Sequence, residues 1–206
     1  MNTSPKFWDK IANRYAKSPV KDEAAYQRKL EVTREYFTPD AVVFEFGCGT
    51  GSTALAHAPF VKHILATDIS PRMIEIAKQK ANAADITNVT FAVSAIEDAA
   101  RGEETYDVVM GHSILHLVED RNAAIAQAHN LLKPGGAFVS STACLGGRMR
   151  WLKLIAPIGR FLGLMPIVSF FTEKELTESI TSAGFVVEHQ WTPPKGIAVF
   201  IVARKV

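Results

Sequence analysis

The chain has 206 residues, which suits one domain and would leave two domains each short of a core. Hydrophobic residues make up 48% and charged residues 21%, a balance that indicates a globular protein and excludes a disordered one. The formal net charge of +2 is too close to neutral to indicate, by itself, a protein that binds nucleic acid.

Two helical patterns open the chain, and they predict N-terminal cap helices within residues 1–38. The first runs from about residue 5 to residue 16. Four of its apolar side chains are spaced to share one face: Phe7, Trp8, Ile11 and Tyr15. The second runs from about residue 22 to residue 37 and stops at Thr38-Pro39, because proline disfavours helix in the residue before it.

Short apolar runs then alternate with helical patterns. The runs predict buried strands at 41–47, 63–68, 88–93, 106–111 and 137–142. The helical patterns lie at 51–58, at 70–83 and, after the fourth strand, up to about Leu132 before the stop signal Lys-Pro-Gly-Gly. This alternation predicts a mostly parallel sheet with helices on both faces.

The C-terminal part follows a different pattern. A helix is expected near residues 172–183, and two apolar runs follow at 185–191 and 197–203, around Pro193-Pro194. These two runs predict an antiparallel hairpin that closes one edge of the sheet. The expected fold is therefore α/β and doubly wound, with seven strands in one domain that spans residues 1–206.

A glycine-rich loop follows the first predicted strand, where open α/β sheets bind their ligands. Gly47, Gly49 and Gly51 alternate there, so the backbone can turn tightly and approach a ligand closely. Glu45 interrupts the apolar strand before the loop, and a buried carboxylate is costly unless it has a function. Asp68 ends the second strand, where a carboxylate can accept hydrogen bonds from both hydroxyls of a ribose.

These residues belong to a series of motifs that resembles the class I S-adenosylmethionine-dependent methyltransferases. The motifs are EFGCGTG (45–51), ATDIS (66–70), VSAIED (93–98), YDVVMGHSILHLVED (106–120) and LLKPGGAFV (131–139). The resemblance is to the small-molecule branch, the type 11-like enzymes that include the ubiquinone and menaquinone C-methyltransferases. It covers residues 5–142 well and the remainder loosely. It implies a Rossmann-like sheet and S-adenosylmethionine as the methyl donor.

The resemblance also implies roles for individual residues. Glu45 and the glycine loop would hold the methionine end and the ribose of the donor, and Asp68 would bind the ribose hydroxyls. Four residues would surround the adenine: Ile69, Ser94, Ala95 and Ile96. Ser94 stands where the family usually has an aspartate that binds the adenine amino group, so it would be a neutral and weaker partner. Tyr15 matches the position where relatives cap the donor and the acceptor.

Two histidines after the fourth strand are candidates for a general base. His112 lies closest to the strand end, and His116 stands where relatives often carry a histidine in the following helix. A neutral imidazole near pH 7 would suit a hydroxyl or an activated-carbon acceptor. The alternative for each is a structural role in the loop. The two are four residues apart, a spacing that can share a metal on a helix, but no third ligand is evident and we expect no metal site.

Residues 143–171 lie where this family usually builds its substrate cover. The segment is rich in large apolar residues and carries four basic side chains without an acidic one: Arg148, Arg150, Lys153 and Arg160. Its charges, prolines and glycines argue against a membrane span. We expect a hydrophobic lid over a small apolar acceptor, quinone-like, aromatic or lipid-like. An interfacial helix and an ordinary packed helix are the alternatives.

An NAD(P)-dependent oxidoreductase on the same type of sheet is an alternative function. Asp68 would suit NAD equally well, although Ser52 occupies the third glycine position of the dinucleotide fingerprint. A non-catalytic module that binds a membrane or a partner is a further alternative. No Asn-Pro-Pro-aromatic motif follows the fourth strand, so we expect no nucleic-acid partner. The N-terminus lacks the apolar segment of a secretory signal, and neither of the two cysteines has the spacing of a metal site. We therefore expect a cytoplasmic protein, one that can contact the inner membrane surface peripherally.

Overall fold

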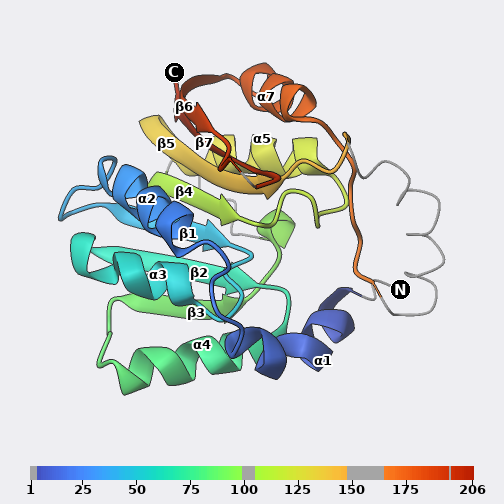
Figure 1. Ribbon diagram of the computed structural model, residues 1–206. Helices are drawn as coiled ribbons and strands as arrows, with labels where there is room; N and C mark the ends of the chain where they lie inside the picture. Colours follow the sequence, from blue (N-terminus) through green and yellow to red (C-terminus); the bar gives the residue numbers. More distant parts are fainter. Residues whose placement is uncertain (1–3, 99–104, 148–164, 195) are drawn as a thin grey trace.

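The protein folds around a single seven-stranded sheet with the strand order β3-β2-β1-β4-β5-β7-β6 (Figure 1). The computed structural model describes residues 4–98, 105–147, 165–194 and 196–206. The strands are β1 (Val42–Phe46), β2 (His63–Asp68), β3 (Val89–Val93), β4 (Tyr106–His112), β5 (Leu132–Ala143), β6 (Phe185–Trp191) and β7 (Ala198–Lys205). The first five pair in parallel, whereas β7 is antiparallel to both β5 and β6. The predicted α/β, doubly wound sheet with an antiparallel edge is confirmed.

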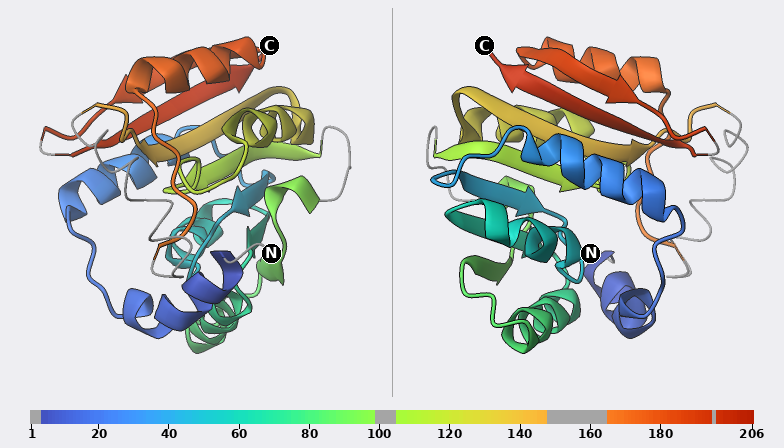
Figure 2. Two further views of the ribbon diagram at one scale, coloured as in Figure 1. Left: turned by 90° about the vertical axis from the view of Figure 1, so that its right-hand side faces the viewer. Right: turned by 60° about the vertical axis from the view of Figure 1, so that its left-hand side comes forward.

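Helices cover both faces of this sheet. The described helices are α1 (Ser4–Ala16), α2 (Glu23–Arg34), α3 (Ser52–His57), α4 (Pro71–Ala83), α5 (Arg121–Leu131) and α7 (Glu173–Ser182), with 3-10 turns η1 (Ala58–Phe60) and η2 (Ile96–Asp98). Buried side chains of α3 and α4 join one core cluster, and those of α5 and α7 join the other. Figure 2 shows α2 crossing the same face as α3, while α1 lies beside α4.

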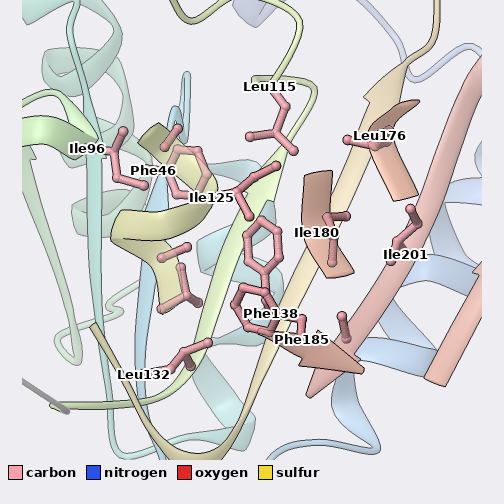
Figure 3. Packing of buried hydrophobic residues seen from close by; sticks show 14 of the residues in the cluster. Phe46, Ile96, Leu115, Ile125, Leu132, Phe138, Leu176, Ile180, Phe185 and Ile201 are labelled. Carbon is pink, nitrogen blue, oxygen red and sulfur yellow. The ribbon is translucent and has the colours of Figure 1, made fainter. Parts of the chain in front are cut away.

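The two cores reflect the alternation of side chains along each strand. On β1, Phe44 and Phe46 face α5 and α7, whereas Val43 faces α3 and α4. Figure 3 shows the first of these clusters, in which side chains of β1, β5, β6, β7 and the two helices lie together. Phe138 and Phe185 stack there, with ring centroids 5.4 Å apart. Because both faces are buried, the strands read as continuous apolar runs in the sequence.

Capping residues define where several helices begin. Ser70 caps α4 by accepting a hydrogen bond from the backbone N–H of Met73, and Pro71 occupies the first turn, as the sequence predicts. Asp120 caps α5 in the same way. Thr172 and Glu175 form a reciprocal capping box at α7. These caps fix the helix starts that face the carboxyl ends of the strands.

Two boundaries differ from the sequence-based expectation. β5 begins at Leu132 rather than at residue 137, because Leu132 already pairs with Tyr106 before residues 133–136 bulge from the register. The hairpin closes the edge of the sheet as predicted, with β7 next to β5 and β6 outermost. Helix α5 begins only at Arg121, so His116 lies in the turn before this helix and not inside it.

Candidate active site

A cavity of about 340 Å³ opens at the carboxyl ends of β1, β2 and β4, with α1 along its side. This is the position where doubly wound sheets bind ligands. Nine of the twelve predicted site residues line it: Tyr15, Gly47, Gly49, Asp68, Ile69, Ser94, Ala95, Ile96 and His112. Glu45, Gly51 and His116 are not on the wall formed by the described residues.

The glycine loop adopts the turn that its sequence predicts. All three glycines have positive φ, at +64° for Gly47, +54° for Gly49 and +76° for Gly51. A Cβ on Gly51 would lie 2.7 Å from the ring of Phe91, so this glycine packs the loop against β3. A Cβ on Gly49 would meet only Tyr15, at 3.6 Å, because this stretch of backbone faces the cavity. The turn therefore presents bare backbone to a ligand.

Asp68 connects the end of β2 to this turn. Its Oδ2 accepts a hydrogen bond from the N–H of Gly49 at 2.9 Å, and its Oδ1 accepts one from the N–H of Ser70 at 2.9 Å. Burial raises the pKa of this carboxyl, and the two backbone donors oppose that shift. Each oxygen keeps a lone pair for a further donor, so the carboxylate can fix the turn and bind a ligand hydroxyl together.

Glu45 lies behind the turn rather than on the cavity wall. Its carboxyl interacts with the backbone N–H of Ala54 at the start of α3, while its Oε2 is buried without a hydrogen-bond partner among the described residues. Burial, and then the charge of Asp68, raise the pKa of Glu45 to about 8. A buried carboxyl with an unsatisfied oxygen destabilises the fold, which points to a positive charge that the site binds nearby.

The N-terminal helix α1 forms one side of the cavity. Trp8 and Tyr15 line the cavity and contact each other edge to face, with ring centroids 6.5 Å apart. Asp9 anchors the helix: its Oδ1 accepts hydrogen bonds from Ser70 Oγ at 2.6 Å and from the N–H of Arg72 at 3.1 Å. No sequence pattern marks Asp9, because its partners lie more than sixty residues away in the chain.

The predicted adenine-binding residues follow the ends of β2 and β3. All four line the cavity: Ile69 after β2, and Ser94, Ala95 and Ile96 after β3. The N–H of Ser94 donates to the carbonyl of Asp68 at 3.1 Å, which holds the loop after β3 against the end of β2. The hydroxyl of Ser94 donates to the carbonyl of Ala95 at 3.0 Å and is therefore already engaged by its own loop.

The two candidate histidines have different positions. His112 ends β4 and lines the cavity, with its Nε2 buried and without a partner among the described residues. Burial, and then the positive charge of Lys29, lower the pKa of His112 to about 4, so its imidazole is neutral at pH 7. Ser113 then turns the chain with a φ of +55°, and His116 falls behind the wall. Burial lowers the pKa of His116 to about 4 as well.

The spacing of the two histidines is therefore not helical. The chain between β4 and α5 forms turns, and the carbonyl of His116 accepts a hydrogen bond from the N–H of Ser169 at 2.7 Å. Within the described part of the chain, no three His, Cys, Asp or Glu side chains are grouped as metal ligands would be.

Only the ends of the segment 143–171 are described, and residues 148–164 with the four basic side chains lie outside the described residues. Ile167 lines the cavity, and the N–H of Gly146 donates to the carbonyl of Phe171 at 2.8 Å. The C-terminal end of the segment therefore passes over the turn after β4. None of the described helices has the length and apolar character to cross a membrane.

The sequence interpretation missed much of the apolar part of the cavity wall. Apolar side chains from the turn after β4 and from nearby elements line it: Phe46, Met73, Ile114, Leu117, Val118 and Ala123. Three carboxylates add a negative rim: Glu97, Glu119 and Asp120. The apolar residues of the motif at 106–120 were the available signal, because the predicted strand ended before them and left them on the ligand-binding edge.

Comparison with known proteins places a methyltransferase domain within the chain. Residues 43–136 match the family model described as a methyltransferase domain. The chain is 29% identical over 69% of its length to a ubiquinone biosynthesis O-methyltransferase of Cereibacter sphaeroides, of which the match covers 59%. It is also 28% identical over 79% of its length to a malonyl-[acyl-carrier protein] O-methyltransferase of Priestia megaterium, of which 60% is covered.

A solved methyltransferase shares the fold. Geranyl diphosphate C-methyltransferase from Streptomyces coelicolor, solved with Mg²⁺, geranyl diphosphate and S-adenosyl-L-homocysteine, superimposes with a TM-score of 0.73 at 16% identity. The superposition covers 89% of this chain and 79% of the solved one. The chain spans less than two thirds of the length of the two curated relatives named above.

Proposed function

We propose that this protein transfers a methyl group from S-adenosylmethionine to a small, largely apolar acceptor. The observation that supports it best is the turn at Gly47–Gly51, which presents bare backbone to the cavity and is held by Asp68. Three features fit the donor: the open backbone at Gly49, the lone pairs left on Asp68, and the unsatisfied Oε2 of Glu45.

The donor would extend along the ends of β1, β2 and β3. Asp68 would accept hydrogen bonds from the ribose hydroxyls, and the backbone of Gly47 and Gly49 would follow the methionine end. Glu45 would act from behind the turn as the negative counter-charge to the ammonium and sulfonium groups. The adenine would lie among four residues: Ile69, Ser94, Ala95 and Ile96. Tyr15 would cover the donor from α1.

The bound donor supplies an activated methyl group on a sulfonium sulfur. The protein must then align the acceptor and exclude water, which is catalysis by proximity and orientation. We assign the general base to His112, because it lines the cavity and its imidazole is neutral at pH 7. It would accept the proton that an acceptor hydroxyl has not already lost to solvent. We assign His116 a role in shaping the turn, since it lies behind the wall.

The acceptor site would be the apolar half of the cavity. Ile114, Leu117, Val118 and Ile167 line this half, which favours an aromatic, quinone-like or lipid-like molecule over nucleic acid. The printed names of two relatives, O-methyltransferases in ubiquinone biosynthesis and on a malonyl carrier protein, favour an oxygen acceptor. Residues 143–171 would form the cover of this site within a single domain of residues 1–206, and residues 1–38 would cap it.

Calorimetry with S-adenosylhomocysteine tests the donor site. The full chain should bind it, and Asp68→Ala should weaken binding by about 10- to 100-fold, because one charge-assisted contact and the anchor of the turn are lost. Asp40→Ala, an exposed carboxylate before β1, is the matched control and should bind like the wild type. NAD should produce no heat. Absence of binding to S-adenosylhomocysteine, or equal affinity in Asp68→Ala, would refute the proposal.

A further inference from the structure

Lys29 on α2 is a partly buried cation with an unusual partner. Its ammonium donates a hydrogen bond to Ser141 Oγ at 2.8 Å, across 112 residues of chain. No carboxylate of the described residues lies within ion-pair distance of it, and burial lowers its pKa, opposed by the more distant charge of Asp22. Keeping a cation here without an anion costs free energy, so an anionic ligand would stabilise it.

Lys29 lies beside the His112 end of the cavity. Ser141 is the register partner of His112 across β4 and β5, so their side chains extend from the same face at the same strand ends. The carbonyl of Ser141 accepts the N–H of Ser113 at 2.6 Å, which fixes this corner. Lys29 is close enough that its charge contributes to the low pKa of His112.

The charged side chains on the described wall of the cavity are all negative. Every Asp, Glu, Lys or Arg side chain on the described wall is a carboxylate: Asp68, Glu97, Glu119 and Asp120. These suit a cationic donor and would repel an anionic acceptor. Lys29, next to the wall at His112, is where a negative charge on the acceptor would be stabilised.

We propose that Lys29, held by Ser141, is the residue that selects acceptors whose reacting oxygen is an acidic hydroxyl, a phenol or an enol. The inference rests on the proposed function and names its acceptor class. As such a hydroxyl docks, its O–H bond breaks, the electron pair stays on the oxygen and the proton leaves to solvent, because the charge of Lys29 opposes a proton on His112. Lys29 offsets the resulting negative charge on the oxygen. Lys29 thus acts as a positioning charge for the reacting oxygen.

The probe is 4-nitrophenol, which absorbs visible light only when ionised. It is titrated with pH in the presence of the full chain saturated with S-adenosylhomocysteine, and the fraction of bound probe that is ionised is measured. The wild type should lower the pKa of the bound phenol. Lys29→Met should decrease the ratio of ionised to neutral bound probe about tenfold. Lys29→Arg, which keeps the charge, should restore most of the effect.

Two controls separate charge from structure. Lys62→Met removes the same charge from an exposed position before β2, at the opposite end of the strands, and should behave like the wild type. Nitrobenzene, a neutral ring of similar size, should bind Lys29→Met and the wild type equally. The role of Lys29 is overturned if bound 4-nitrophenol is equally ionised in the wild type and in Lys29→Met. It is also overturned if Lys29→Met loses as much affinity for nitrobenzene as for ionised 4-nitrophenol, or if the wild type leaves the pKa of the bound phenol unchanged.

The same samples report on the proposed function separately. If S-adenosylhomocysteine binds and only the response of the probe is absent, the inference about Lys29 fails and the donor site stands. If S-adenosylhomocysteine does not bind the wild type, the proposed function fails and the inference falls with it.

Discussion

Glu45→Gln should stabilise the donor-free protein and weaken its affinity for the donor. Glu45 is 1% exposed and has one oxygen without a partner among the described residues. Glutamine has nearly the same shape and keeps an oxygen that can accept from the N–H of Ala54, but it never ionises. The substitution therefore removes an ionisable group while preserving the packing of β1 against α3.

The magnitude follows from the pKa of Glu45, which is raised from 4.5 to about 8, first by burial and then by Asp68. Between these values the folded state holds a proton that the unfolded chain has released. The stability that this carboxyl contributes is therefore complete below pH 4.5 and is lost as the pH rises toward 8. At pH 7 the loss is about 3 kcal/mol, at 1.36 kcal/mol for each pKa unit.

Urea denaturation at several values of pH between 5 and 8 measures this directly. The free energy of unfolding of Glu45→Gln should exceed that of the wild type by an amount that grows with pH, to about 3 kcal/mol at pH 7. Glu31→Gln, an exposed glutamate on α2, is the control and should show no such trend. Calorimetry should show about tenfold weaker binding of S-adenosylhomocysteine to Glu45→Gln, because the ammonium loses a counter-charge.

The reasoning would be refuted by a difference in unfolding free energy that stays constant with pH, since the effect would then not come from ionisation. It would also be refuted by a stabilised variant that binds S-adenosylhomocysteine as tightly as the wild type. In that case the carboxylate would serve neither the fold nor the donor.

Three further changes test other parts of the site. Gly51→Ala should lower the free energy of unfolding by about 3 kcal/mol in urea denaturation, because the backbone there has a positive φ and the new Cβ would clash with Phe91. Gly135 also has a positive φ, but no atom lies within 4 Å of its Cβ position, so Gly135→Ala should lower the free energy of unfolding by only about 1 kcal/mol. Ser94→Asp should tighten S-adenosylhomocysteine binding about tenfold in calorimetry, by supplying a charged acceptor to the adenine amino group. His57 is fully buried. Burial, and then the charges of His112 and Arg34, lower its pKa from 6.5 to about 3. The stability that the neutral imidazole contributes is therefore complete above pH 6.5 and is lost as the pH falls toward 3. The wild type should therefore lose about 2 kcal/mol through His57 between pH 7 and pH 5, and His57→Gln should remove that part of the pH dependence.

Local patterns were sufficient to predict most of the fold. A strand buried on both faces is a continuous apolar run, and each run that the sequence marks is a strand in the structure. The insertion of β7 between β5 and β6 could not be predicted, because strand order depends on pairing between distant segments. The start of β5 was missed because Leu132 pairs with Tyr106 before Lys133-Pro134-Gly135-Gly136, a sequence typical of a turn, which bulges from the ladder with Gly135 at positive φ.

The site was predictable where backbone conformation alone decides it. Positive φ at Gly47, Gly49 and Gly51 requires glycine, and this requirement is visible in the sequence. Spacing was a poorer guide for His112 and His116. A helix would place them on one face, but the positive φ of Ser113 directs the chain elsewhere, so only His112 lines the cavity.

The position of Lys29 on helix α2 shows how much of a side chain's environment helical periodicity can predict. Helix α2 places Tyr26, Leu30 and Thr33 at helical spacing, and Leu30 and Thr33 are buried. Lys29 lies next to this stripe, three residues after Tyr26 and four before Thr33, so it is a charge where the pattern calls for an apolar side chain. Glu45 on β1, unlike Lys29, was singled out from the sequence, because it interrupts an apolar strand. For both residues only the fold shows what the side chain faces: the glycine turn for Glu45, and Ser141 beside His112 for Lys29.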